Sequence, residues 1–344
     1  MREAAERKKG NGHRERVGAE DSDHHPRHRT SQPAGAGAII AKNPQNLNFG
    51  GFSRCVVKRF IPQNKNETNK TITKTREYGL QFFNKKIEEK ETVKITKKHR
   101  GWLGFGGAQM KDDAKADLKE SFLWGYQDES GKSLEDHPLR GQNLWPSFLP
   151  SLQENCMDFF NQADLLAKDL LRGFAIAMNL DENFFLKNTS RPLSRASLVY
   201  YPSQPEKMGI DQFGVGPHTD FGTLTILCQD DVGGLQVQDI NGDWFHAPPI
   251  QGTIIVNVAD LLSRWTGGEY KSTPHRVVNS SSKERLSLVL AFDPNPETMI
   301  DPKEVHGKSF NSKEDPISCG DYLISVSYTH LRAHETPEQR RCRG

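Results

Sequence analysis

The sequence has little cysteine and no cysteine pattern. Its 344 residues include only five cysteines, and no two of them form a C-x-x-C pair; they are at positions 55, 156, 228, 319 and 342. This spacing excludes zinc ribbons and disulfide-rich secreted scaffolds, which need closely spaced cysteines. A reducing compartment is therefore expected, with the cytoplasm as the default.

Long hydrophobic runs and an excess of one charge are also missing. The longest apolar stretches have the length of a β-strand, and residues 1–30 contain no apolar core of the signal-peptide kind. We therefore expect neither a membrane span nor a signal peptide. The 46 basic and 44 acidic residues nearly cancel, so nothing in the charge balance indicates nucleic acid as a partner. No protein partner is evident.

Composition marks off both ends of the chain. Residues 1–45 are rich in charge, Gly, Ser and His, which predicts a disordered extension whose histidines are solvated. Residues 326–344 are polar and basic without periodicity, which predicts an unstructured tail. The tail is similar to translated adaptor sequence, and a basic interaction tail is the alternative.

The region before residue 180 has helical patterns. Between Leu149 and Leu180, apolar side chains recur at steps of three and four, which predicts one helix packed against a sheet. The stripe consists of Leu152, Cys156, Phe159, Ala163, Leu166, Leu170, Phe174 and Ala177. A weaker helical pattern covers residues 76–89, where Phe83 and Ile87 are four apart. No opening strand is recognisable before it.

From Ser197 to Phe292 the pattern changes to about eight short β-type runs separated by Gly, Pro and Asp turns. Helices followed by strands predict an α+β fold. Antiparallel strands that close around a ligand favour a double-stranded β-helix, or jelly-roll, core with supporting N-terminal helices. One interruption, residues 260–268, is expected to be a short helix with Asp260 as a structural N-cap and a glycine stop.

Metal-binding residue types occur where one strand is expected to start. His218 and Asp220 are two residues apart, so on an extended strand they project from one face and can hold the same ion. A turn at residues 214–217 precedes the pair, and the alternating run at residues 221–227 follows it. On its own an H-x-D pair is common by chance and is more often part of an exposed loop.

A second histidine completes the ligand set. His275 opens the β-type run of residues 275–279, just after Pro274, and proline is tolerated at the start of a strand. Two imidazoles and one carboxylate form a facial triad, which leaves coordination positions open and favours non-heme Fe(II) oxygenase chemistry. The sequence therefore predicts His218, Asp220 and His275 as metal ligands and as the catalytic centre.

A basic and a hydroxyl side chain share one face of the last β-type run, residues 285–292. Arg285 and Ser287 are two apart, and a guanidinium fork on an inward-facing position needs an anion such as a carboxylate. The alternative is an arginine paired with a core Asp or Glu. Tyr201 is a further candidate donor to the same carboxylate, and a simple strand-end aromatic is its alternative role.

The order of five short motifs resembles the isopenicillin N synthase-like branch of the iron(II)/2-oxoglutarate-dependent dioxygenases. The motifs are Tyr-Tyr-Pro at 200–202, Gly-Pro-His-Thr-Asp at 216–220, Gly-Gly-Leu-Gln-Val at 233–237, Ser-Thr-Pro-His-Arg-Val at 272–277 and Arg-Leu-Ser at 285–287. The resemblance is strong over residues 101–302 and weaker over residues 51–98. It implies that residues 46–180 are the helical N-terminal region and residues 181–325 the jelly-roll dioxygenase core.

The resemblance also implies site roles. His218, Asp220 and His275 would hold Fe(II). The distal carboxylate of the cosubstrate 2-oxoglutarate would be bound by Tyr201, Arg285 and Ser287. The chain departs from many plant members at position 199, where they have Asn and this chain has Val199.

The function implied is oxidation of a small-molecule substrate by O2, by hydroxylation or a related reaction, with release of succinate and CO2. Loop residues and strand positions such as Phe292 would line the substrate pocket. One alternative is an Fe(II) oxidase without 2-oxoglutarate, in which Arg285 and Ser287 bind the substrate's own carboxylate. The other is a non-catalytic jelly-roll binding module, which has no reason to keep open metal positions.

Overall fold

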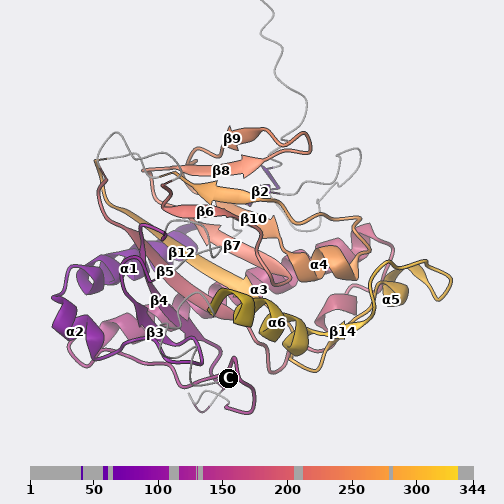
Figure 1. Cartoon of the computed structure of the whole chain (residues 1–344), viewed down its shortest axis with the longest axis horizontal. Coiled ribbons are helices and arrows are strands. Elements are labelled where there is room, and N and C mark those ends of the chain that lie inside the picture. The colour runs from indigo at the N-terminus through magenta and orange to yellow at the C-terminus, as the bar shows by residue number, and fades with distance from the viewer. Residues whose placement is uncertain are drawn as a thin grey trace, which may run out of the picture. The chain divides into compact units, whose positions relative to one another are not determined.

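The computed structural model describes residues 40–41, 57–60, 65–107, 116–128, 130, 135–204, 212–278 and 282–331. The chain divides into two units, residues 1–34 and 35–344, and every described residue belongs to the second. This second unit combines helices with largely antiparallel sheets (Figure 1), which confirms the predicted α+β class. No helix among the described residues is long and apolar enough to cross a membrane.

Two sheets form the framework of this unit. The main sheet has the strand order β1 (Ile40–Ala41), β2 (Val57–Phe60), β10 (Ile254–Val258), β7 (Leu224–Cys228), β12 (Arg285–Phe292), β5 (Arg195–Tyr201), β4 (Glu120–Gly125), β3 (Gly101–Leu103). The small sheet has the order β6 (Val215–His218), β11 (His275–Val277), β8 (Leu235–Gln238), β9 (Trp244–His246). A two-stranded ladder joins β13 (Met299–Ile300) to β14 (Ile317–Ser318). The strands β5 to β12 confirm the predicted eight.

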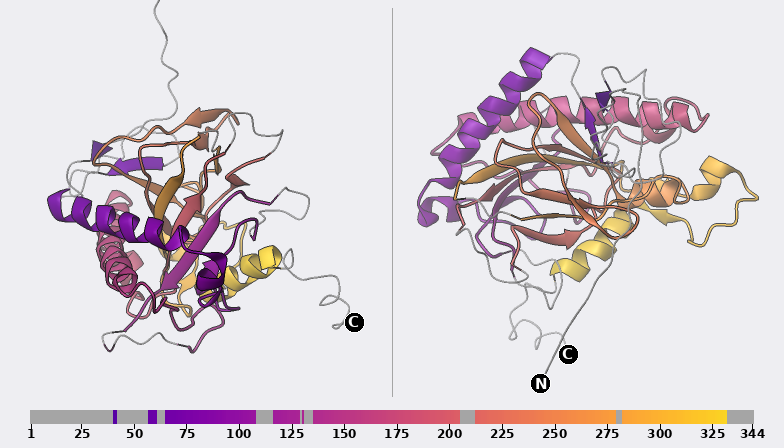
Figure 2. Two further views of the ribbon diagram at one scale, coloured as in Figure 1. Left: turned by 90° about the vertical axis from the view of Figure 1, so that its left-hand side faces the viewer. Right: turned by 90° about the horizontal axis from the view of Figure 1, so that it is seen from above.

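Helices flank these sheets. They are α1 (Lys65–Phe83), α2 (Ile87–Glu91), α3 (Ser151–Ala177), a 3-10 turn η2 (Phe184–Leu186), α4 (Asp260–Trp265), α5 (Pro302–His306) and α6 (Cys319–Leu331). Helices α1 and α3 lie on the same side of the main sheet (Figure 2). The prediction for α3 is confirmed, because most of the apolar stripe from Leu152 to Phe174 is buried, although Ala177 at its end is exposed.

The two faces of the main sheet have different neighbours. On β12, Leu286, Leu288 and Leu290 belong to the large apolar core shared with α1 and α3. A second apolar cluster lies on the opposite face and joins main-sheet residues such as Tyr201 to small-sheet residues such as Val277. The small sheet therefore packs against this opposite face, which we call the inner face of the main sheet.

The structure corrects several predictions at the ends of the chain. Strand β2 pairs with β10, so an opening strand exists that the sequence did not reveal. Helix α6 continues to Leu331, so the prediction of an unstructured tail is wrong for residues 326–331. Disorder of residues 1–45 is wrong at β1, Ile40–Ala41. The rest of that extension, with its histidines at 24, 25 and 28, and residues 332–344 lie outside the described residues.

Candidate metal and cosubstrate site

The three predicted metal ligands come together between the sheets. His218 is the last residue of β6, Asp220 follows in the next turn, and His275 opens β11 directly opposite His218. One ligand atom from each residue lies within 4.8 Å of the other two. The Nε2 atom of His275 is 3.7 Å from Oδ1 of Asp220, and the two imidazole rings are 4.3 Å apart between centroids. This spacing fits one shared cation.

Backbone carbonyls fix the tautomer of both histidines. Nδ1 of His218 lies 2.8 Å from the Gly216 carbonyl oxygen, and Nδ1 of His275 lies 3.0 Å from the Thr273 carbonyl oxygen. A carbonyl oxygen only accepts hydrogen bonds, so each Nδ1 carries the proton in a neutral ring. The Nε2 lone pairs are then free to bind a metal, an arrangement typical of metal-ligating histidines.

The protonation states also suit a cation. Burial lowers the pKa of His218 to about 3, and the neighbouring His275 acts in the same direction. Burial alone would raise the pKa of Asp220, but the two histidines and hydrogen bonds from Thr225 and Asn257 outweigh it and lower the pKa. At neutral pH the site therefore offers neutral His218 and an ionised carboxylate, the forms that bind metals.

The three residues predicted to bind a carboxylate, which we call the carboxylate clamp, lie on the same inner face; they are Tyr201, Arg285 and Ser287. Arg285 is only 1% exposed, and its Nε donates to the Gly233 carbonyl at 2.6 Å. Among the described residues, no hydrogen-bond partner is found for Nη1 and Nη2 of Arg285 or for Oγ of Ser287. Unsatisfied buried donors are costly and rare in folded proteins. Tyr201 is directly opposite Arg285 on β5, so the structure brings all three predicted clamp residues together.

The glycine pair before β8 supports this clamp, a role that the sequence analysis missed. Gly233 and Gly234 both have positive φ, at 84° and 91°. A Cβ atom on Gly234 would lie 2.6 Å from the carbonyl oxygen of Val278, so the position has no room for a side chain. The pair sets the path of the chain that delivers the Gly233 carbonyl to Arg285. The Gly-Gly-Leu-Gln-Val motif was the available signal.

Asp260 has a different role from the one predicted. Helix α4 starts at Asp260 itself, and the N-cap is Ala259, so the N-cap prediction was wrong. The Asp260 carboxylate accepts a hydrogen bond from Oγ1 of Thr219 at 3.1 Å, and its backbone N–H donates to the Asp220 carbonyl at 2.8 Å. Burial raises the pKa of Asp260, while the neighbouring hydroxyl groups act against this rise. Asp260 therefore braces the turn that carries the first two ligands.

Two other residues singled out in the sequence contribute no polar group to this site. Phe292 is fully buried in the large core on the opposite face of β12, so the structure does not bring it together with the clamp. Val199 is directly opposite Ser287 on β5 and offers no polar side chain at this point.

Comparisons with known proteins identify the class. The chain matches the model of the 2OG-Fe(II) oxygenase superfamily over residues 194–294 and that of the N-terminal region of non-haem dioxygenases in morphine synthesis over residues 56–148. A probable iron/ascorbate oxidoreductase of Dictyostelium discoideum is 33% identical over 319 residues, which cover 84% of this chain and 85% of that protein. A homoarginine-6-hydroxylase of Glycine max is 32% identical over 256 residues, covering 71% and 76% of the two chains.

Solved structures agree with this class. A full-length Neurospora crassa protein solved in complex with alpha-KG has a TM-score of 0.69 at 28% identity, covering 79% of this chain and 86% of that one. The chain belongs to the 2OG-Fe(II) oxygenase superfamily. It is an oxidoreductase that uses Fe(II), 2-oxoglutarate and O2, which confirms the predicted enzyme class and cofactors over the binding-module alternative.

Proposed function

We propose that His218, Asp220 and His275 hold the Fe(II) ion of this oxygenase. The support comes from the shared 4.8 Å spacing of their ligand atoms and from the two Nδ1 contacts to carbonyl oxygens. Asn257 adds a hydrogen bond to Oδ2 of Asp220 at 3.2 Å, which leaves Oδ1 for the metal. These contacts orient the three ligands before the ion binds.

We further propose that Arg285, Ser287 and Tyr201 bind the distal carboxylate of 2-oxoglutarate. The single observation that carries this assignment is the set of orphaned donors, Nη1 and Nη2 of Arg285 and Oγ of Ser287, on the metal side of the main sheet. A carboxylate is acceptor-only and has the shape to satisfy both guanidinium donors at once. Among the described residues, no ion pair is found for Arg285.

The architecture that we propose is the double-stranded β-helix, with the helical region of residues 46–180 supporting a core at residues 181–325. The support is the packing of the small sheet on the inner face of the main sheet, which places ligands from β6 and β11 opposite the clamp on β12. The similarity to the Neurospora crassa protein agrees with this arrangement.

Within this site, the protein orients the reactants and excludes water. When bound, Fe(II) and 2-oxoglutarate supply the oxidising chemistry, with succinate and CO2 as products. The clamp fixes one end of the cosubstrate, and the apolar residues beside it, such as Leu227 and Val289, limit access of water from that side. We propose a small molecule as the second substrate, because the Neurospora crassa protein is also solved with thymine and other relatives are named for homoarginine.

The metal assignment is tested by equilibrium dialysis of Fe(II) without oxygen. Replacing Asp220 with Ala removes the only anionic ligand, so Fe(II) affinity and succinate formation should both fall sharply while the fold remains. The matched control is Asp243→Ala, which removes an exposed carboxylate just before β9. Equal Fe(II) affinity for the two variants would reject the assignment.

A further inference from the structure

The inner face of the main sheet is only partly covered along β5 and β12. On β5 the inner positions Arg195, Ser197 and Val199 are half-buried, whereas the residues between them are buried in the core. On β12 the same alternation makes Val289 and Ala291 half-buried. A close-packed layer over this face would bury these side chains completely. The inner face at these positions therefore borders open space on the metal side.

Arg195 lies on this face at a defined position relative to the metal ligands. Cross-strand pairing places Asn257, Thr225, Ala291 and Arg195 in one row across four neighbouring strands. Residues directly opposite one another share a face, and the row spans three strand spacings, or about 14 Å. Asn257, at one end of the row, donates a side-chain hydrogen bond to Asp220. Ala291 and Thr225 are the only side chains between the two ends of the row.

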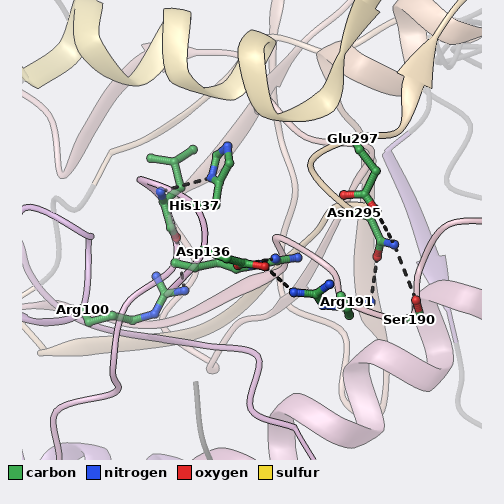
Figure 3. A network of polar contacts seen from close by, with 9 residues as sticks. Arg100, Asp136, His137, Ser190, Arg191, Asn295 and Glu297 are labelled. Carbon is green, nitrogen blue, oxygen red and sulfur yellow. Dashed lines mark hydrogen bonds and ion pairs between the residues drawn. The ribbon is translucent and has the colours of Figure 1, made fainter. Parts of the chain in front are cut away.

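A second guanidinium group lies beside Arg195. Gly125 is paired with Arg195 on β4, and a Cβ atom on Gly125 would lie 2.2 Å from Nη2 of Arg100. The guanidinium of Arg100 therefore occupies the space where a side chain of Gly125 would be, on the same inner face. Arg100 is 2% exposed and donates to the carbonyl oxygens of Lys98, His99 and Leu139. Figure 3 shows Arg100 at one end of a polar network that includes Asp136.

Among the described residues, neither guanidinium group forms an ion pair with a carboxylate, although the charge of Arg195 acts on the buried Asp293. The partners of Arg100 are neutral carbonyl groups, and its Nε has no partner among the described residues. Within the same part of the chain, no side-chain hydrogen bond or ion pair is found for Arg195. Burial and the positive charges of Arg195 and Arg140 lower the pKa of Arg100 to about 9, so it is still charged at neutral pH.

The two neighbouring acids, Asp136 and Asp293, form no ion pair with Arg100 or Arg195 among the described residues. Asp136 is paired with Arg140 and with Arg191. Asp293 is fully buried, and Oδ1 accepts the Thr223 N–H at 3.3 Å. Burial raises the pKa of Asp293 to about 6, and the charge of Arg195 only partly opposes this rise. Two guanidinium groups without a directly paired carboxylate, Arg195 half-buried and Arg100 buried, are unfavourable together, so an incoming anion would be stabilised here.

We propose that Arg195, backed by Arg100, binds a carboxylate group of the organic substrate, so that this enzyme oxidises small carboxylic acids. The proposal rests on the proposed position of the Fe(II) ion. Ala291 is next to Arg195 in this row, and Thr225 follows it toward Asn257, so the part of the substrate beside the carboxylate passes an apolar side chain and is hydrocarbon. The oxidised carbon is then remote from the carboxylate, separated from it by an apolar chain.

The test uses a matched set of probes and the full-length protein loaded with Fe(II) and 2-oxoglutarate without oxygen. The probes are 3-phenylpropanoate, 5-phenylpentanoate and 7-phenylheptanoate, each compared with its primary amide by isothermal titration calorimetry. At least one acid should bind about ten times more tightly than its amide. Arg195→Met should weaken the binding of that acid by about ten- to a hundredfold, as expected for the loss of a charge-assisted contact. The affinity for the amide should not change.

The control is Arg172→Met, which removes an exposed arginine paired with Asp169 on α3. It should change neither the affinity for the acids nor that for the amides. Arg195→Lys keeps the charge and should retain part of the preference for the acid. Any one of three results would overturn the proposal. The first is that the acids bind no better than the amides, the second that they fail to bind up to their solubility limit, and the third that Arg195→Met binds them as tightly as the unmodified protein does. Fe(II) and 2-oxoglutarate binding are measured on the same samples. If the unmodified protein bound neither Fe(II) nor 2-oxoglutarate, the proposed metal and clamp residues would be rejected instead.

Discussion

The guanidinium group of Arg285 stacks on the ring of Tyr201, with its central carbon 4.7 Å from the ring centre. The two residues are directly opposite one another on β12 and β5. Because the ring covers one face of the guanidinium and the Gly233 carbonyl accepts from Nε, the Nη1 and Nη2 edge is the part left for a ligand. This geometry orients the fork before any carboxylate binds.

Replacing Arg285 with Lys should therefore impair cosubstrate binding specifically. Lysine keeps the positive charge but loses the planar fork and the stacking on Tyr201. Loss of one charge-assisted hydrogen bond costs about 1.5 to 3 kcal/mol, so the apparent constant for 2-oxoglutarate should rise by about one to two decades. Fe(II) affinity, measured by dialysis on the same variant, should not change. A parallel loss of Fe(II) would show that Arg285 supports the fold and not only the ligand.

Asp260 should affect metal binding without touching the metal. Asp260→Ala removes the acceptor for Thr219, which lies between the two ligands of the first turn. Loss of such an outer contact typically weakens metal binding about 10- to 100-fold. Asp260→Asn keeps an acceptor oxygen and should restore most of the affinity. If Asp260→Ala binds Fe(II) as tightly as the unmodified protein, the bracing role is wrong.

Gly234 and Gly242 form a natural pair for testing the glycine turn. Both have φ of 91°, but a Cβ on Gly234 would meet the Val278 carbonyl at 2.6 Å, whereas the nearest atom to a Cβ on Gly242 is 3.8 Å away. Gly242→Ala should cost only the backbone strain, about 1 kcal/mol. Gly234→Ala should cost more, about 2 to 4 kcal/mol, and weaken 2-oxoglutarate binding. Urea denaturation of the two variants checks the order.

Asp293 makes stability depend on pH in an unusual direction. Burial raises its pKa in the folded state to about 6, above the value of an exposed carboxyl group. The folded state therefore binds this proton more tightly than the unfolded state, and the contribution of Asp293 to stability falls as pH rises toward 6. Asn cannot ionise, so the advantage of Asp293→Asn over the unmodified protein should grow by about 1 to 2 kcal/mol from pH 5 to pH 7.5. Parallel urea curves at both pH values would contradict this.

The metal ligands were predictable because their residue types alone indicate metal binding. His218, Asp220 and His275 are a known ligand combination. The strand pattern correctly placed His275 at the start of a strand, but the predicted turn at residues 214–217 was wrong, because residues 215–218 form β6 and His218 ends it. The order of the motifs carried the same information for Arg285 and Ser287. Helix α3 was predictable for a similar reason, since a long apolar stripe has few other structural solutions.

Other features depend on contacts between distant segments, which one sequence does not show. Strand β2 has only four residues, and pairing with β10 defines it more than its own pattern does. Asp260 was predicted to be an N-cap because Asp is favoured at that position, but its side chain accepts a hydrogen bond from Thr219 instead. Phe292 was placed in a substrate pocket although it is at an even position of β12, on the core side. The position of Arg100 beside Arg195, in the space above Gly125, is visible only in the three-dimensional structure.

The most direct measurement of the central assignment is a single turnover without added organic substrate. The protein is loaded with Fe(II) and 2-oxoglutarate in the absence of oxygen, mixed with oxygenated buffer, and its succinate is quantified beside Asp220→Ala and Arg285→Lys. We expect succinate from the unmodified protein, none above background from Asp220→Ala, and a reduced amount from Arg285→Lys that recovers at high 2-oxoglutarate. Equal succinate from all three proteins would contradict the assignment of both the metal ligands and the clamp.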